Sequence, residues 1–217
     1  MKLSSTFEQT IEHTHRRLLR KTVIGILLVT GASLMVNGGY IQLKALLGQW
    51  LINKAWQESS SAHQPKPWPW MDSWPVAKIH IPRLNIQQVI LEGDSGQSLA
   101  FGPGHRLTSA MPGEQGTMLV SGHRDTHFRF LQKLQPDDEI RLVTPDGTAH
   151  FYQVETMDVL NADDSLISDP TEHFLVLATC WPFDQLTPTD QRYVVVARQR
   201  RSLTADKTEQ TSDSTLG

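Results

Sequence analysis

The chain has 217 residues, of which 20% are charged, and its formal net charge is only -3. This length allows one domain of ordinary size with extra segments, and the near-neutral charge supplies no field that would attract nucleic acid. The single cysteine, Cys180, cannot form an intramolecular disulfide, which excludes the small disulfide-stabilised class. We expect neither a nucleic-acid partner nor a cofactor.

The N-terminal region is typical of a membrane anchor. Basic residues in segment 1–21 precede a stretch, 22–43, that carries no charge. A helix needs roughly 20 apolar residues to cross a bilayer, and basic flanks mark the cytoplasmic side. We predict a single-pass membrane protein with residues 1–21 in the cytoplasm, a transmembrane anchor at 22–43 and the remainder outside the cytoplasm. The alternative is a cleaved signal peptide, since Gly31, Ala32 and Ser33 are small residues that follow a short apolar core.

Residues 44–75 separate the anchor from the rest of the chain. Their first part mixes apolar side chains with Gln and Lys, which predicts an amphipathic helix that continues from the anchor. The second part is rich in serine, proline and tryptophan, which predicts a linker and puts a domain boundary near residue 75. Its tryptophans, Trp68, Trp70 and Trp74, would either sit at the lipid interface or cover an apolar edge of the domain.

From residue 76 onward, short runs of β-forming residues alternate with turns. This pattern predicts a mainly β domain at 76–201, built as a barrel or a sandwich. Seven runs are expected as strands: 76–81, 86–91, 117–121, 139–144, 149–155, 174–179 and 193–198. We also expect short helices at 96–101 and 128–134, a hairpin turn at 145–147 and a disordered polar tail at 202–217.

Three reactive side chains lie at the ends of predicted strands. Cys180 ends one apolar run, His123 follows another, and Arg192 opens the last. Strand ends can converge at one mouth of a barrel. There a thiol supplies a nucleophile, an imidazole carries a proton and a guanidinium stabilises an oxyanion. The combination predicts acyl transfer through a thioester at Cys180.

Each of these residues also has an ordinary structural interpretation. A lone cysteine after an apolar run is often a small core residue. His123 could bind a metal ion with Asp125 and His127 at alternate positions, although no further Cys or His spacing supports such a site. Arg192 could cap a strand edge. The residues by themselves leave the catalytic and the structural interpretations open.

The cysteine lies in a motif that resembles one of the sortases, which are membrane-anchored cysteine transpeptidases. The sortase signature reads Thr-Leu-x-Thr-Cys, and this chain matches it at Leu177, Thr179 and Cys180. Val176 replaces the first Thr.

Two further elements of the resemblance occur in the expected order. Upstream, residues 102–105, 112–116 and 121–128 are similar to the stretch that leads to the sortase histidine, which corresponds to His123. Downstream, Arg192 corresponds to the sortase arginine, just ahead of the final predicted strand.

The resemblance covers residues 75–200 and implies an eight-stranded β-barrel of the sortase type. It also implies cleavage of a motif like Leu-Pro-x-Thr-Gly in a substrate protein, and transfer of the acyl group to an amine acceptor of the cell envelope. Cys180 would attack the Thr carbonyl, His123 would protonate the departing amine, and Arg192 would hold the substrate or the oxyanion. The single anchor and the Trp-rich linker look most like the class GN sortases of Gram-negative bacteria.

Two other functions stay open. An L,D-transpeptidase acting on peptidoglycan would carry Ser-His-Gly before its cysteine, whereas Ala178 and Thr179 precede Cys180 here. An anchored binding module that has lost its chemistry is the second alternative, and only the changed Val176 favours it.

Overall fold

The computed structural model of this chain describes residues 3–161, 171–185, 187 and 189–200. The predicted polar tail at 202–217 lies outside these residues. Contacts between residues divide the chain into two compact units, Met1–Leu47 and Gly48–Gly217.

The first unit is helical. The helix α1 (Leu3–Glu58) begins in this unit and ends in the second. Its part from Leu19 to Glu58 is long and apolar enough to cross a membrane, by length and composition. Large apolar side chains of the first unit are exposed, for example Leu28 at 68% and Met35 at 81%. The long apolar helix expected at the N-terminus is confirmed.

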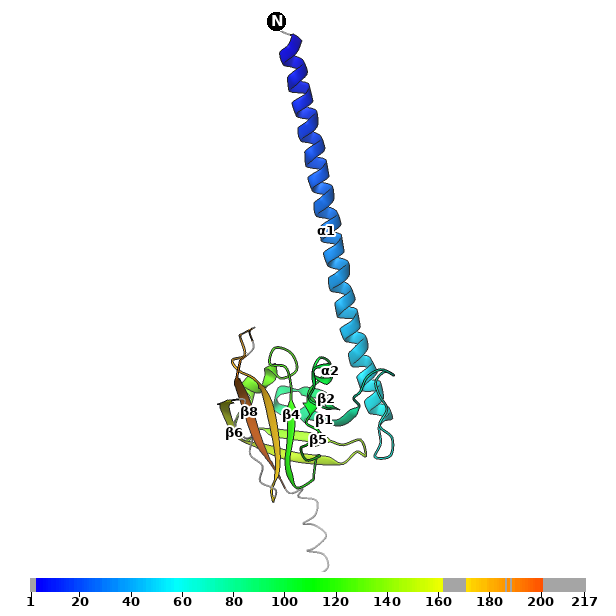
Figure 1. The fold of residues 1–217 in the computed structure, drawn as a ribbon. Coiled ribbons are helices and arrows are strands. Elements are labelled where there is room, and N and C mark those ends of the chain that lie inside the picture. The colour runs from blue at the N-terminus through cyan, green and yellow to red at the C-terminus, as the bar shows by residue number, and fades with distance from the viewer. Residues whose placement is uncertain (1–2, 162–170, 186, 188, 201–217) are drawn as a thin grey trace, which may run out of the picture. The chain divides into compact units, whose positions relative to one another are not determined.

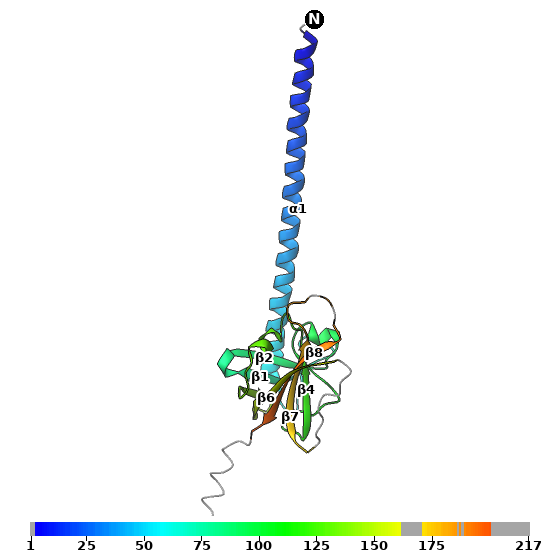
Figure 2. The same cartoon turned by 90° about the vertical axis from the view of Figure 1, so that its left-hand side faces the viewer.

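The second unit is built around a closed barrel of eight strands (Figures 1 and 2). The strands are β1 (Pro75–Ile81), β2 (Ile86–Glu92), β3 (Gly104–His105), β4 (Gly116–Ser121), β5 (Glu139–Val143), β6 (Ala149–Asn161), β7 (His173–Cys180) and β8 (Gln191–Gln199). Around the barrel the order is β1-β2-β3-β4-β7-β8-β6-β5, and β5 pairs with β1. Most neighbours are antiparallel, but β3 runs parallel to β2 and β4 parallel to β7. The predicted eight-stranded barrel is confirmed.

All seven predicted strands are present, and the differences have simple causes. The unpredicted strand, β3, is only two residues long and contains no apolar run that would identify it. The strand β6 extends to Asn161, beyond the expected end at residue 155, because it continues to pair with β8 although its later side chains are mostly exposed. The short helices are α2 (Gly96–Leu99), η1 (Pro82–Leu84) and η2 (Arg129–Lys133).

Alternation along β4, β7 and β8 gives these strands two apolar faces. One face belongs to the barrel interior, with Met118, Leu175, Leu177 and Val195 in the main core. The residues between them form a second cluster on the outer face: Leu119, Phe174, Val176, Ala178, Val194 and Val196. Because side chains in a strand alternate between faces, position 180 falls on the same outer face as Ala178.

The segment ahead of the barrel packs against it. Ile52 of α1 and Met71 are 2% and 0% exposed, and both belong to a cluster with Val89 and Leu91 of β2. The ring of Trp68 meets that of Phe101 edge-on, with the centroids 4.8 Å apart. The compact unit therefore begins at Gly48, and the stretch expected as a linker covers an apolar edge of the barrel.

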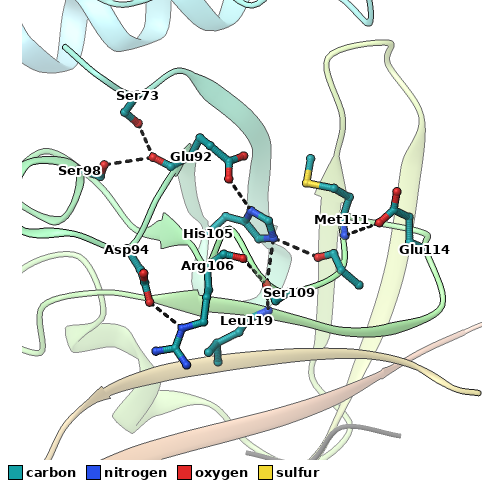
Figure 3. A network of polar contacts seen from close by, with 11 residues as sticks. Ser73, Glu92, Asp94, Ser98, His105, Arg106, Ser109, Met111, Glu114 and Leu119 are labelled. Carbon is teal, nitrogen blue, oxygen red and sulfur yellow. Dashed lines mark hydrogen bonds and ion pairs between the residues drawn. The ribbon is translucent and has the colours of Figure 1, made fainter. Parts of the chain in front are cut away.

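A buried charged pair joins β2 to β3 and β4 (Figure 3). Glu92 of β2 and His105 of β3 are 8% and 2% exposed. The Nδ1 atom of His105 lies 3.2 Å from Oε1 of Glu92, and its Nε2 atom lies 3.1 Å from the carbonyl oxygen of Ala110. Ser109 Oγ lies 3.0 Å from the same Nε2 and accepts a hydrogen bond from the backbone N–H of Leu119 in β4.

The network indicates that His105 is an imidazolium. The carboxylate of Glu92 and the carbonyl of Ala110 can only accept, and the Ser109 hydroxyl donates its own proton to the Arg106 carbonyl. Both ring nitrogens of His105 must therefore donate. Burial lowers the pKa of His105, but the hydrogen bond and charge of Glu92, together with backbone acceptors, outweigh burial and raise the pKa.

A raised pKa of His105 makes the stability of the barrel depend on pH. The stabilisation is fully present below the unfolded pKa of about 6.5 and is lost as the pH rises through the higher pKa of the folded state. We predict that the free energy of unfolding of the chain from Gly48 onward, measured by denaturant titration, decreases between pH 6 and pH 9. The variant Glu92→Gln should be less stable by about 1–3 kcal/mol at pH 6 and should show a weaker decrease.

The matched control for this prediction is Glu139→Gln, which changes an exposed carboxylate of β5. Its pH profile should follow that of the wild type. Parallel profiles for wild type and Glu92→Gln would show that the buried pair does not control the pH dependence.

Candidate active site

Cys180 ends β7 at the point where the strand leaves the apolar interior. The six residues before it, Phe174–Thr179, are buried, whereas Cys180 is partly exposed. Trp181 and Pro182 follow, and proline has no N–H to extend the ladder. The thiol is free, and it lies on the outer face of the barrel at the end of a rigid strand.

Arg192 lies directly across from the thiol. In the antiparallel pairing of β7 with β8, Cys180 and Arg192 are partners. The Cβ atoms of such cross-strand partners lie about 4.5–5.5 Å apart. Nη1 of Arg192 donates to the carbonyl oxygens of Thr189, at 2.7 Å, and Gln191, at 3.0 Å. These bonds occupy Nη1 and tie the guanidinium to the segment that leads into β8.

His123 reaches the same place from β4. In the parallel pairing of β4 with β7, Ser121 is level with Ala178. Gly122 makes the last hydrogen bond of this register, and continuing the register by one residue would put His123 level with Cys180. His123 is exposed, so its imidazole is accessible from solvent. The parallel arrangement of β4 and β7 can be followed in Figure 2.

Two hydrogen bonds continue this register past the last strand residue of β4. The N–H of Gly122 donates to the Ala178 carbonyl at 3.1 Å, and the Thr179 hydroxyl donates to the Gly122 carbonyl at 2.6 Å. A side chain at Gly122 would meet the ring of Phe128, because a Cβ there would lie 2.7 Å from the nearest ring carbon. Glycine therefore allows the chain to pass this ring immediately before His123.

An apolar strip on the outer face leads up to these three residues. It consists of the outer-face cluster described above, and Ala178 and Val194 are its members nearest to Cys180 and Arg192 in sequence. Leu160 of β6 packs against the cluster. Its members are at most 8% exposed, so the strip supports the strand ends that carry the three residues and is not an open surface.

Arg124 contributes a contact that the sequence did not suggest. It is only 8% exposed, and its Nη2 donates to the Thr187 carbonyl at 2.8 Å. This bond ties the turn after His123 to the connection between β7 and β8. From the sequence, an arginine between His123 and Asp125 would be expected to be a solvent-exposed turn residue. It is buried because it packs against the connection between β7 and β8. Thr179 also helps to position the site, through its hydrogen bond to the Gly122 carbonyl. Its match to the sortase signature is the sequence signal that could have identified it.

Three aromatic side chains that follow Cys180 and Arg192 in sequence pack against one another. Trp181 stacks on Tyr193, with centroids 5.6 Å apart and an interplanar angle of 25°. Phe183 meets both rings edge-on. Phe183 and Tyr193 also pack against the barrel core, so the residues that follow Cys180 and Arg192 are anchored by apolar contacts.

The structure gives no support to a metal centre at His123, Asp125 and His127. Among the residues it describes, no three His, Cys, Asp or Glu side chains form a group that could hold a metal ion. Burial lowers the pKa of His127, and the neighbouring His123 lowers it further. His123 and His127 are therefore close to one another, and His127 favours its neutral form.

Strand register thus brings all three sequence-predicted residues, Cys180, His123 and Arg192, to one end of β4, β7 and β8. The arrangement combines a partly exposed thiol, an accessible imidazole and a held guanidinium. It is suited to nucleophilic attack on a carbonyl with proton transfer and oxyanion stabilisation.

Comparison with known proteins matches residues 79–200 to the sortase domain family. Sortase D of Bacillus subtilis (strain 168) is 34% identical over 122 residues, which are 56% of this chain and 62% of that protein. Sortase SrtE1 of Streptomyces coelicolor is 30% identical over 125 residues, which are 49% of this chain and 36% of that protein. The aligned parts span less than two thirds of either relative.

Solved structures agree with this match. A Clostridium perfringens Sortase D5 transpeptidase is similar with a TM-score of 0.52 and 30% identity, over 58% of this chain and 79% of that one. Sortase A from Corynebacterium diphtheriae has a TM-score of 0.55 and 25% identity, over 65% of this chain and 64% of that one. The family match covers more than half of the chain and almost the whole barrel, and the chain therefore belongs to the sortase family.

Proposed function

We propose that this chain is a membrane-anchored cysteine transpeptidase with Cys180 as nucleophile, His123 as proton carrier and Arg192 as oxyanion partner. The observation that carries the proposal is the strand register, in which Arg192 is the cross-strand partner of Cys180 and His123 is level with it. Membership of the sortase family supports the same reaction class, and one similar structure is described as a transpeptidase.

In the first half of the reaction, the Cys180 thiol passes its proton to His123, and Sγ attacks a peptide carbonyl of the donor protein to form a tetrahedral intermediate. The guanidinium of Arg192 donates to the developing oxyanion. His123 gives a proton to the leaving amine, the C–N bond breaks and a thioester remains on the sulfur. In the second half, an acceptor amine attacks the thioester, its proton passes to His123, and the C–S bond breaks. Water in place of the amine gives hydrolysis.

The donor is proposed to be a substrate protein with a sorting motif like Leu-Pro-x-Thr-Gly. Membership of the sortase family supports this choice. The departure from the signature at Val176 leaves the reactive groups intact. Val176 is 1% exposed and lies within the strip, so its change does not favour an inactive binding module.

The alternative of an L,D-transpeptidase gains no support. The sequence before Cys180 differs from its signature, and the family match is to sortases.

We propose that α1 anchors the enzyme in the inner membrane with the N-terminus in the cytoplasm and the barrel in the periplasm. The exposed apolar side chains of the first unit support a lipid environment, and the basic residues of segment 1–21 support this orientation. We assign the chain to the class GN sortases on its single anchor and Trp-rich segment. The two curated relatives come from Gram-positive bacteria and lend this subclass no support.

Substitution of the three site residues tests the proposed chemistry. With a sorting-motif peptide and the full chain in detergent, Cys180→Ala should abolish cleavage, because no thioester can form. His123→Ala should reduce kcat by about 10²–10⁴-fold, and Arg192→Lys by about 10²-fold, because Lys cannot reproduce the planar donor geometry. The matched control is His63→Ala, which changes an exposed histidine ahead of the barrel. Full cleavage by Cys180→Ala would refute the nucleophile assignment.

Reporter fusions test the proposed topology. In a Gram-negative host, alkaline phosphatase fused after Gln57 should be active, because that enzyme folds only in the periplasm. The same reporter fused after Lys21 should be inactive, since basic residues stay on the cytoplasmic side. The opposite pattern of activities would contradict the orientation.

A further inference from the structure

A polar groove lies along β2, on the side of the His123 loop away from β7. Two pockets, with cavity volumes of about 200 Å³ and 240 Å³, adjoin because Gln88 and His127 line both. One pocket continues to Lys78 of β1 and to the end of α1, and the other continues along η2. We call the two pockets together the β2 groove. Its lining residues are Gln49, Asn53, Lys78, Ile86, Gln87, Gln88, Val89, Phe101, Gly102, Pro103, Thr126, His127, Arg129, Phe130, Gln132 and Lys133.

The β2 groove begins on the loop that carries His123. The N–H groups of Thr126 and Phe128 donate to the His123 carbonyl, at 3.4 Å and 2.9 Å, so this loop folds back on itself. Gln88 Nε2 donates to the His127 carbonyl at 2.9 Å, which fixes the loop against β2. In the barrel order, β4 lies between β2 and β7. The His123 loop therefore separates the groove from the apolar strip.

The charges of the groove are of one sign. Lys78, Arg129 and Lys133 are the charged lining residues, and no Asp or Glu is among the described residues that line it. Lys78 is only partly exposed, and no ion pair involves it within the described chain. Burial and His123 lower the pKa of His127, and the charge of Asp125, which does not line the groove, only partly opposes them. Cationic side chains without a neighbouring counter-charge favour an anionic ligand.

The groove also holds an unused hydrogen-bond acceptor. Oε1 of Gln88 is buried and has no partner among the described residues. Buried polar groups normally have a partner, and this oxygen, which solvent does not reach, lacks one in the described part of the chain. Amide side chains of Gln49, Asn53 and Gln87 add further donors and acceptors. Alternating donors and acceptors beside a cation suit a peptide that carries carboxylates.

We propose that the β2 groove binds the second substrate, an anionic peptide that presents a free amine to the thioester. This inference rests on the proposed function. The acceptor amine attacks the thioester carbonyl, a C–N bond forms, the C–S bond breaks, and the proton of the amine passes to His123. The carboxylates of the acceptor lie in the groove, with Lys78 as the main contact. In this arrangement the acceptor approaches from the side of the His123 loop on which Thr126 and His127 line the groove.

Two acceptors that differ only in charge test the proposal on the full chain in detergent. They are the amidated peptides Gly-Gly-Glu-Glu and Gly-Gly-Gln-Gln, each supplied with a sorting-motif donor peptide. The wild type should prefer the Glu peptide by about tenfold in kcat/KM for transfer, because a charge-assisted bond to Lys78 adds this much. Lys78→Glu should remove or reverse the preference, and Lys78→Gln should remove it. The control Lys66→Glu reverses an exposed lysine outside the groove and should keep the wild-type preference.

Direct binding separates this inference from the proposed function. The Glu peptide is titrated into full-length Cys180→Ala, which cannot react, and into Cys180→Ala combined with Lys78→Gln. We expect the second protein to bind about tenfold more weakly. Equal affinities, or an unchanged acceptor preference in Lys78→Glu, overturn the groove as the acceptor site. Absence of any acyl adduct on wild-type Cys180 refutes the proposed function, and the binding comparison still decides on the groove.

Discussion

The parallel pairing of β4 with β7 is the constraint on which the candidate site depends. His123 and Cys180 are far apart in sequence, and they become neighbours only because these two strands run side by side in a fixed register. A slip of one residue would turn every side chain of a strand to its other face. The register is held by the buried apolar residues on both faces of the two strands and by the hydrogen bond from Thr179 to Gly122.

Along these strands, buried residues that hold the structure alternate with residues that could take part in the reaction. The hydrogen bond from Thr179 to Gly122 joins the two strand ends, and Cys180 and His123 are the next residues in the chain. The same alternation puts Arg192 outward and Tyr193 inward, where it packs against the core. The reactive groups thus take their positions from buried neighbours in the chain, which explains how an exposed site can be fixed in place. The connection after β7 is held in turn by Arg124.

Sequence patterns predicted those parts of the fold that rest on local periodicity. Seven strands and both short helical segments were expected at their observed positions, because apolar runs and turn residues mark them. The two-residue strand β3 has no such run, and its place depends on pairing with β2 and β4. The second half of β6 is mostly exposed and was missed for the same reason. Composition left two positions open for the tryptophans ahead of the barrel, the lipid interface or an apolar edge of the domain, and the contact of Trp68 with Phe101 favours the second for that residue.

In the candidate site, too, features marked by local sequence could be predicted, and features that depend on distant contacts could not. Cys180, His123 and Arg192 could be selected from the sequence because each lies at the end of a strand-like run and in a family motif. The roles of Arg124 and Gln88 could not be predicted from the sequence, because they depend on contacts with carbonyl groups far along the chain. The buried pair of Glu92 and His105 was missed in the same way. Two residues that look like surface charges in sequence become partners only when β2 and β3 pair.

Disulfide cross-linking of the full-length variant His123→Cys tests the central geometry most directly. Adjacent strands lie about 4.8 Å apart, within the range of Cα distances that a disulfide can bridge. Mild oxidation should link position 123 to Cys180, which mass spectrometry of the digested protein detects as one joined peptide pair. The control Lys66→Cys should give no intramolecular link. A His123→Cys protein that folds but leaves both thiols free under these conditions would contradict the register, and with it the proposed site.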